Sequence, residues 1–389
     1  MANMEGDYKV LVVRSSWTER HVARYVSRLL SRGLSSDRTF TLLDVEDLVN
    51  KVTTWKEELP RITPFYVTKC SETLGVTYGT GVGYPINAKP RTHLLHARQH
   101  GVDLLTFDAD IELLKIKQFH PNAKYVFLSF YYVTPHVIDY LDSKFGCCPR
   151  TEAPVLLNIA KELNLQVVGV SFHVRGVGMY RRGIQLSAQL FDIGFSLGFH
   201  MQILNIGGGM PGDQDCIYLQ VAREINSALN EYFPPDNEVE IIAEPGRYFV
   251  ASAFTTIGQQ TEAEKMHYYM DNGIYGSFSG ITSGRMVVNP QPLEVTLIIK
   301  IFNFSVVCPL QELPGLYEPC ILWGPTSDGC DLVSQEAILP PLPLPSWLLF
   351  RNAGAYTSTT STAFCGLAKP KDYAYSTQTL LTSLLWTNI

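Results

Sequence analysis

The sequence predicts an α/β protein in which a parallel β/α barrel is followed by a smaller all-β domain. From Pro64 to Ala243, short apolar runs alternate with segments of helical spacing, a pattern typical of parallel β/α units. The number of repeats favours a barrel over an open sheet. After about Arg247 the pattern changes to β-rich runs separated by glycine and proline, which indicates a second domain.

The expected elements alternate along the chain. Strands are expected at residues 102–107, 124–130, 165–173, 201–206 and 239–243. Helices are expected at residues 42–52, 110–119, 153–163, 183–197 and 216–232. We therefore predict three segments, which are an N-terminal lead-in (1–36), the barrel (37–250) and a C-terminal β domain (251–389).

Composition narrows the class of protein. The chain has 389 residues, a formal net charge of −6 and 46% hydrophobic residues, which suits a large domain with a smaller one. The mild acidity and the lack of a basic stripe argue against nucleic-acid binding. The eight cysteines form no CxxC pair, so we expect neither a metal site nor a disulfide framework.

No targeting or membrane segment is evident in the sequence. Residues 1–9 lack the apolar core of a signal peptide. The most apolar run, residues 297–308, is interrupted by polar residues and is too short to span a bilayer. We therefore expect no membrane partner and a cytoplasmic location.

The stretch PFYVTKC, residues 64–70, combines a β-prone run with a lysine. If the strand continues through it, Lys69 lies at the C-terminal end, which faces the active site of a β/α barrel. A lysine that is partly desolvated there has a lowered pKa and can form a Schiff base. Taken alone, the stretch fits an exposed lysine better, and only its partners reverse that judgement.

Two further motifs follow strands of the predicted barrel. His173 ends an apolar strand and could stack on a planar cofactor, although a core histidine is nearly as good an interpretation. Gly207, Gly208 and Gly209 stand between a strand and a helix, where backbone N–H groups can bind a phosphate. The pattern is not GxGxxG, so a Rossmann site is disfavoured, while a tight turn without a ligand remains open.

The last predicted barrel strand is followed by Glu244 and Arg247. Glu244 could bond a protonated pyridine nitrogen, and Arg247 could pair with a phosphate, or the two could simply close a turn. The motifs WGPTSDG (323–329) and GAYT (354–357) each resemble turns when taken alone. Together, a lysine, a histidine, a glycine turn, an acid and an arginine are what a pyridoxal phosphate site requires.

Several of these motifs are long and specific, namely PFYVTKC, GVDLLTFDADIELLK, VVGVSFHV, ILNIGGGMPG, EPGRYFVASAF, DNGIYGSF, WGPTSDG and AGAYTSTTSTAF. On them, the chain resembles the eukaryotic ornithine decarboxylase and antizyme inhibitor family, as a divergent member. The resemblance implies a TIM-like barrel of the alanine-racemase type, a C-terminal β domain and a head-to-tail homodimer with shared active sites. It also implies an amino-acid substrate and a place in polyamine metabolism.

The resemblance also implies a role for each site residue. Lys69 would hold pyridoxal 5'-phosphate as a Schiff base, His173 would stack on its ring and Glu244 would bond the ring nitrogen. The phosphate would be bound by Gly207, Gly208, Gly209, Arg247 and Tyr356. Asp328 matches the acid that reaches the substrate's distal amine from the neighbouring subunit, and Ser327 stands where the family has its catalytic cysteine.

The chain departs from the family at the substrate side. The family cysteine helps to direct reprotonation, so Ser327 affects rate and product fidelity. Gly284 stands at a second substrate aspartate, and its loss weakens recognition of a second amine and favours a neutral side chain. Leu128 replaces a family arginine. In the phosphate loop, Arg175 replaces a glycine and Gly176 a serine.

Block-like length changes accompany these substitutions. After residues 79–84 the family continues with a strand, a helix and a third strand, whereas residues 85–89 follow here at once. Parallel neighbours need a crossover of about a dozen residues, so the barrel is expected to lack one crossover helix. Residues 255–266 are shorter than in the family, and 289–316 have no counterpart. A splice variant or an imperfect gene model would explain such changes.

Three hypotheses follow from these observations. The first is a pyridoxal phosphate-dependent decarboxylase, favoured by the retained cofactor residues. The second is an inactive antizyme-inhibitor-like protein that binds antizyme, for which Lys89, Arg91, His93, His96 and Arg98 survive in a basic helix, although a solvated helix face explains that run more simply. The third is a damaged product without a stable fold.

Overall fold

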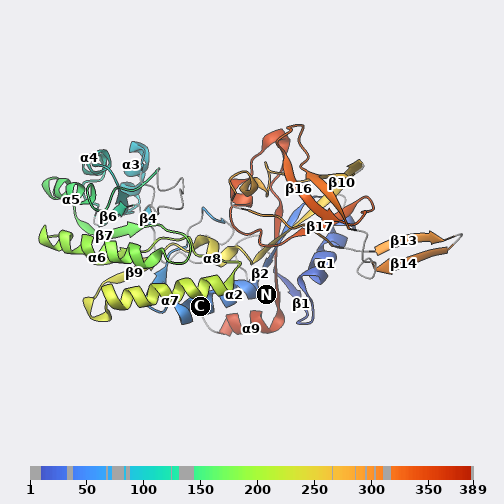
Figure 1. Cartoon of the computed structure of the whole chain (residues 1–389), viewed down its shortest axis with the longest axis horizontal. Coiled ribbons are helices and arrows are strands. Elements are labelled where there is room, and N and C mark those ends of the chain that lie inside the picture. The colour runs from blue at the N-terminus through green and yellow to red at the C-terminus, as the bar shows by residue number, and fades with distance from the viewer. Residues whose placement is uncertain are drawn as a thin grey trace. The chain divides into compact units, whose positions relative to one another are not determined.

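The computed structural model describes residues 10–32, 38–66, 69–71, 83–84, 88–123, 125–130, 144–264, 266–284, 286–293, 296–301, 304–309 and 317–386. The chain divides into two compact units, which Figure 1 shows in the colours of the sequence. The sheet unit comprises residues 1–52, 69–72 and 249–389. The β/α unit comprises residues 53–68 and 73–248.

The β/α unit contains one parallel sheet whose strands alternate with helices. Its strands are β3 (Ile62–Pro64), β4 (Gly83–Tyr84), β5 (Leu104–Phe107), β6 (Tyr125–Phe130), β7 (Val167–Phe172), β8 (Ile203–Asn205) and β9 (Glu240–Ala243). They are joined in the order β3-β9-β8-β7-β6-β5-β4. The helices between them are α3 (Arg91–Gln99), α4 (Asp110–Phe119), α5 (Ala153–Glu162), α6 (Tyr180–Ser196) and α7 (Asp215–Tyr232).

The central strands of this sheet are apolar because both of their faces are covered. Val167, Val170 and Phe172 of β7 and Leu204 of β8 are all buried. Among the described residues this sheet has seven strands, and no pairing joins β3 to β4. The segment at which the loss of one crossover was predicted lies mostly outside the described residues, so that loss stays a prediction.

One strand prediction was wrong. β3 ends at Pro64, so the strand does not continue to Lys69, which lies in a turn. Its partner β9 ends at Ala243, which accepts a last hydrogen bond from the Phe65 N–H at 2.8 Å. Beyond Ala243, Pro245 has no N–H to continue the ladder and Gly246 begins α8 (Gly246–Val250).

The sheet unit is built on a mixed nine-stranded sheet. The main path is β1 (Leu11–Val13), β18 (Lys371–Thr377), β2 (Phe40–Asp44), β10 (Phe254–Glu264), β11 (His267–Met270), β15 (Glu318–Trp323) and β16 (Leu332–Leu339). To β10 is added β17 (Ser346–Phe350), which pairs with β12 (Gln291–Pro292). A separate hairpin consists of β13 (Thr296–Ile301) and β14 (Phe304–Pro309). The unit also holds α1 (Glu19–Arg32) and α9 (Gln378–Trp386).

The structure places the N-terminal segment differently from the expected lead-in and barrel start at residue 37. β2 lies in the middle of the large sheet, where Leu43 pairs with Phe254 of β10 and with Ala374 of β18. Its Phe40 and Leu42 are almost fully buried in the core of this unit. The predicted helix at 42–52 therefore begins only at Val45, as α2 (Val45–Glu58). These pairings are long-range contacts that no local pattern reveals.

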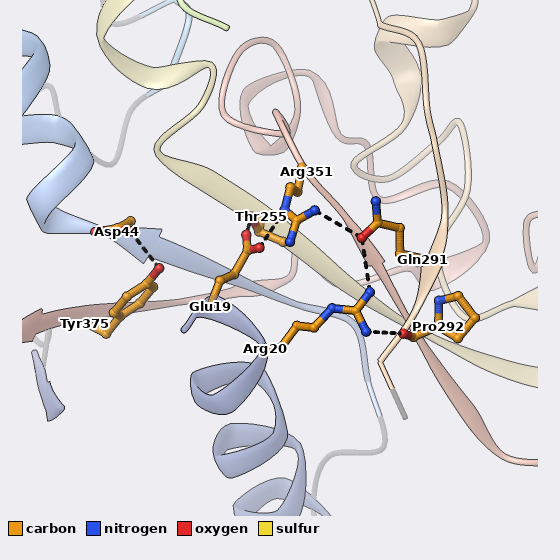
Figure 2. Close-up of polar contacts among 8 residues, drawn as sticks. All are labelled: Glu19, Arg20, Asp44, Thr255, Gln291, Pro292, Arg351 and Tyr375. Carbon is orange, nitrogen blue, oxygen red and sulfur yellow. Dashed lines mark hydrogen bonds and ion pairs between the residues drawn. The ribbon is translucent and has the colours of Figure 1, made fainter. Parts of the chain in front are cut away.

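Polar contacts fasten α1 to strands from the far end of the chain, as Figure 2 shows. Glu19 accepts hydrogen bonds from the Thr255 hydroxyl and from Arg351 Nε, the latter at 2.7 Å. Gln291 Oε1 accepts from Arg351 Nη1 at 3.0 Å and from Arg20 Nη2 at 3.2 Å. The N-terminal residues therefore belong to the sheet unit through both backbone and side-chain bonds.

Within the described part of the chain, no helix is long and apolar enough to cross a membrane. The same residues contain no cluster of three or more histidine, cysteine or acidic side chains that could hold a metal ion.

Candidate cofactor and substrate site

Three of the predicted features meet at the carboxyl ends of neighbouring strands in the β/α unit. His173 follows β7, the glycine turn 207–209 follows β8 and Glu244 follows β9. The Gly208 N–H donates to His173 Nδ1 at 3.2 Å, and the Glu244 N–H donates to the Gly207 carbonyl at 2.7 Å. His173 is exposed, so it is not a core histidine, and the main chain holds its ring in place.

The glycine turn is packed so tightly that side chains are excluded from it. Gly207 and Gly209 have φ angles of +67° and +89°, which non-glycine residues rarely adopt. A Cβ atom on Gly207 would lie 2.2 Å from the Phe172 carbonyl oxygen, and one on Gly209 would lie 2.0 Å from that of Val174. The turn therefore brings bare backbone to the ends of β7, β8 and β9, which is what a phosphate-binding loop needs.

The N–H groups of the turn are not all available to a ligand. The Gly207 N–H donates to Asn205 Oδ1 at 2.8 Å, and the Gly208 N–H donates to His173 Nδ1. The Gly209 N–H has no hydrogen-bond partner among the described residues. A phosphate would thus be bound mainly at the Gly209 end of the turn.

Asn205 is a site residue that the sequence reasoning missed. Its side chain is buried, and its Nδ2 donates to Glu244 Oε1 at 2.8 Å while its Oδ1 accepts from Gly207. The available signal was a polar residue that ends an apolar strand two residues before the first glycine of the turn. Arg247, three residues after Glu244, is half-buried, and its carbonyl oxygen would lie 2.5 Å from a Cβ on Gly212.

Two residues that follow β7 lie beside the same turn, Arg175 in the loop after the strand and Tyr180 as the first residue of α6. The buried Tyr180 hydroxyl donates to the Gly208 carbonyl at 2.7 Å, and burial raises the pKa of Tyr180, so the phenol stays protonated as a donor. Arg175 is exposed, and its Cα would lie 3.3 Å from a Cβ on Gly209. Among the described residues its guanidinium makes no hydrogen bond or ion pair, which leaves a cation beside the turn.

Lys69 and Tyr356 belong to the sheet unit. The Tyr356 N–H donates to the Cys70 carbonyl at 3.0 Å, and Lys69 Nζ lies 6.0 Å from the centre of the Tyr356 ring. The two predicted residues are thus neighbours. The Lys69 side chain is exposed in this structure, and a partly desolvated lysine stays a prediction.

The predicted substrate acid is already engaged by its neighbours. Asp328 Oδ2 accepts from the Tyr275 hydroxyl, and its Oδ1 accepts from the Cys330 N–H at 2.9 Å. The bond from Tyr275 lowers the pKa of Asp328, and the same bond raises the pKa of Tyr275 to about 12. Phe364 packs on Tyr275 with the ring centres 4.3 Å apart, while Ser327 is exposed.

A second missed residue, Asp331, organises the loop that carries Ser327 and Asp328. It is only 1% exposed. Its carboxylate accepts from the Ile274 N–H at 2.9 Å, and from the N–H and hydroxyl of Thr326 at 3.0 and 2.7 Å. Asp331 therefore joins the loop before Asp328 to the loop that holds Tyr275. The available signal was an acid two residues after the WGPTSDG motif, which itself resembled a turn.

The predicted residues thus form two groups, one in each unit. The β/α unit holds His173, the glycine turn, Glu244 and Arg247, with Asn205 connecting them. The sheet unit holds Lys69, Tyr356, Ser327 and Asp328.

Comparison with known proteins gives the class to which this arrangement belongs. Residues 79–251 match the pyridoxal binding domain of the pyridoxal-dependent decarboxylases, and residues 249–354 match their C-terminal sheet domain. Among solved structures, the arginine decarboxylase of Paramecium bursaria Chlorella virus bound to agmatine has a TM-score of 0.79 and 28% identity, covering 91% of this chain and all of that one. The fold is therefore that of a pyridoxal-dependent decarboxylase.

Closer relatives narrow the class to a family. The chain is 34% identical to ornithine decarboxylase of Mus pahari, over 86% of this chain and 80% of the relative. It is 31% identical to that of Caenorhabditis elegans, over 94% and 93%, and 33% identical to antizyme inhibitor 2 of Xenopus laevis, over 86% and 80%. The chain belongs to the ornithine decarboxylase and antizyme inhibitor family. Its cofactor is pyridoxal phosphate, which the exposed histidine, the bare glycine turn and the acid fit.

Proposed function

We propose that this chain is a pyridoxal phosphate-dependent carboxy-lyase that converts an amino acid into an amine and CO₂, with a pocket that favours a neutral side chain over ornithine. The observation that carries the proposal is the bonded group of His173, the glycine turn and Glu244 in the β/α unit. These contacts hold an imidazole, bare backbone and an acid together at the ends of three neighbouring strands, which suits a planar cofactor with a phosphate.

Each residue has a distinct part in this proposal. Lys69 would hold the cofactor covalently, His173 would lie against its ring and Glu244 would accept a hydrogen bond from its ring nitrogen. The phosphate is bound by the glycine turn, Arg247 and Tyr356. When bound, pyridoxal phosphate accepts the electron pair that remains as CO₂ departs. Ser327 supplies a hydroxyl near the substrate, and because a hydroxyl is a weaker acid than a thiol, proton delivery is slower than from the family's cysteine.

The preference for a neutral substrate rests on how few free acidic oxygens the substrate side offers. Both carboxylate oxygens of Asp328 are bonded to Tyr275 and to the Cys330 N–H. Gly284, with a φ of +64°, has no carboxylate to offer and nothing within 4 Å of where its Cβ would be. The distal amine of a diamino acid would therefore have one carboxylate to pair with, that of Asp328, which is already hydrogen-bonded, instead of two. This favours a substrate with an apolar side chain, such as leucine. In this proposal Asp328 acts across a homodimer interface.

The direct test measures CO₂ release by purified protein with pyridoxal phosphate, from leucine, ornithine and lysine in turn. We expect release from leucine to exceed that from ornithine, and Lys69→Ala to abolish release from both. Release from ornithine at a higher kcat/KM than from leucine would contradict the proposed preference. Absence of release from every amino acid, with the cofactor bound, would contradict the proposed activity.

The second candidate is an inactive protein that binds antizyme, and it is supported by the exposed basic face of α3 together with the lost aspartate at Gly284. Arg91, His93, His96 and Arg98 are exposed on this helix. Lys89 is not part of that face, because its side chain is buried. Its Nζ donates to the Thr106 carbonyl and lies 3.3 Å from Glu112 Oε2. A pull-down with purified antizyme tests this candidate, with Arg91→Glu/Arg98→Glu as the variant and Lys161→Glu on α5 as the control. Capture of antizyme by the parent and by the control, but not by the α3 variant, would support it.

A further inference from the structure

Arg175 is an exposed cation beside the glycine turn of the β/α unit. It stands three residues after the end of β7, and its Cα would lie 3.3 Å from a Cβ atom on Gly209. Within the described part of the chain, its guanidinium makes no hydrogen bond and no ion pair. A guanidinium keeps its charge in proteins, so this side chain brings five N–H donors and a full positive charge that no acid of the described residues engages.

The charge of Arg175 acts on a residue that contacts the turn. Tyr180, the first residue of α6, donates its hydroxyl hydrogen bond to the Gly208 carbonyl at 2.7 Å. Burial raises the pKa of Tyr180, and the positive charge of Arg175 opposes that rise. A charge affects a phenol in this way only from nearby. The guanidinium therefore lies close to the end of the turn that Tyr180 contacts.

The glycine turn by itself offers a phosphate few donors. The N–H groups of Gly207 and Gly208 already donate to side chains of this unit, whereas the Gly209 N–H has no partner among the described residues. A phosphate ester has three oxygens that accept hydrogen bonds and a charge of about −1.5 to −2 at pH 7. Binding it at the Gly209 end requires further donors and positive charge, and Arg175 is the cation whose main chain packs there.

The N-terminus of α6, another place at which this loop could bind an anion, is occupied by a carboxylate. Glu224 of α7 accepts from the N–H groups of Gly178 and Arg181 at 2.6 and 2.8 Å. A phosphate at the start of the helix would meet this negative charge, so binding there is disfavoured. Nothing lies within 4 Å of where a Cβ atom on Gly176 or Gly178 would be, which leaves open space in the loop that begins at Arg175.

We propose that Arg175 binds the phosphate group of the cofactor, as a second guanidinium in addition to that of Arg247, and makes the site selective for phosphorylated forms of the cofactor. The inference rests on the proposed function, because it needs the cofactor to be bound at the glycine turn. A guanidinium can donate two parallel hydrogen bonds to a phosphate, and its charge offsets that of the dianion. Arg175 therefore contributes to binding of the phosphate and not to binding of the ring.

The test compares two ligands that differ only in the phosphate, pyridoxamine 5'-phosphate and pyridoxamine. Neither has an aldehyde, so their binding does not depend on a covalent bond to Lys69. Each ligand is titrated into the purified full chain by calorimetry. The variants are Arg175→Gln, Arg175→Lys and, as a matched control, Arg223→Gln, which removes the same charge from an exposed position of α7 in the same unit.

We expect the parent and Arg223→Gln to bind pyridoxamine phosphate with equal affinity, and much more tightly than pyridoxamine. In Arg175→Gln the affinity for pyridoxamine phosphate should fall about tenfold, the equivalent of one charge-assisted hydrogen bond, while the affinity for pyridoxamine stays the same. Arg175→Lys keeps the charge but loses the paired donors, so its loss should be smaller. A thermal melt of each variant reports whether it is folded, and if Arg175→Gln does not fold, Arg175→Lys carries the comparison.

Two results would overturn the inference while leaving the proposed function standing. One is an unchanged affinity of Arg175→Gln for pyridoxamine phosphate. The other is an equal loss of affinity for both ligands, which would assign Arg175 a structural role in the loop. A parent that binds neither pyridoxamine phosphate nor pyridoxal phosphate would refute the proposed function itself, and the inference with it.

Discussion

Removing the Asp331 carboxylate should destabilise the sheet unit far more than removing its neighbour Asp328. In Asp331→Ala, the N–H groups of Ile274 and Thr326 lose their acceptor, and so does the Thr326 hydroxyl. A buried donor left without a partner costs about 1–3 kcal/mol, and Thr326 is only partly buried, so we expect a loss of about 2–4 kcal/mol in the free energy of unfolding. Asp331→Asn keeps the shape and one acceptor oxygen, and we expect about half that loss.

The assay is urea denaturation followed by tryptophan fluorescence, because Trp323 lies on the strand that leads into this loop. Asp328→Asn is the matched control. This variant removes a carboxylate three residues away that lies nearer the protein surface than Asp331. We expect the denaturation midpoint of Asp328→Asn to equal that of the parent. An Asp331→Ala midpoint as close to the parent as that of Asp328→Asn would refute the role assigned to Asp331.

Three further predictions concern the glycine turn and two acids. Gly209→Ala and Gly178→Ala both place alanine at a left-handed φ, +89° and +87°, but only Gly209 has a carbonyl in the way. Cofactor titration should therefore show a loss of about tenfold or more for Gly209→Ala and little change for Gly178→Ala, and equal losses would contradict the packing argument. Tyr275→Phe removes the bond that lowers the pKa of Asp328. The acidic limb of the pH profile of kcat/KM for a cationic substrate should then move to higher pH. An unchanged acidic limb would show that Tyr275 does not lower the pKa of Asp328. Burial raises the pKa of Asp271 above 3.8, so the folded chain holds more protons than the unfolded one between the two values, and stability falls as pH rises through that window. Asp271→Asn should remove this part of the dependence of Tm on pH, and an identical pH dependence in both proteins would count against it.

The alternating part of the fold could be predicted from local patterns because each β/α repeat carries its own apolar spacing. The helix predicted at residues 110–119 is confirmed with the same bounds as α4, and the strands β5 to β9 lie within two residues of their predicted limits. Local patterns failed where pairing is long-range. β2 pairs with β10 and β18, more than 200 residues further along the chain, so nothing near Phe40 indicates that it lies in a central strand.

The candidate site was predicted as single residues, whose roles stay predictions, and not as a network. His173, Glu244 and the glycines stand out in the sequence because their chemistry is rare at strand ends. Asn205 and Asp331 do not stand out, because their importance comes from the hydrogen bonds that they form in the folded chain. The strand through Lys69 was also wrong, because the end of β3 is set by where its partner β9 ends.

We propose that this chain uses pyridoxal phosphate, bound covalently at Lys69, to decarboxylate an amino acid. The most direct test is a visible absorption spectrum of purified protein with pyridoxal phosphate, recorded for the parent and for Lys69→Ala, before and after addition of leucine. We predict a band from covalently bound cofactor in the parent only, which changes as leucine is added and CO₂ is released. A spectrum that is the same in both proteins, and equal to that of free pyridoxal phosphate, would contradict the account.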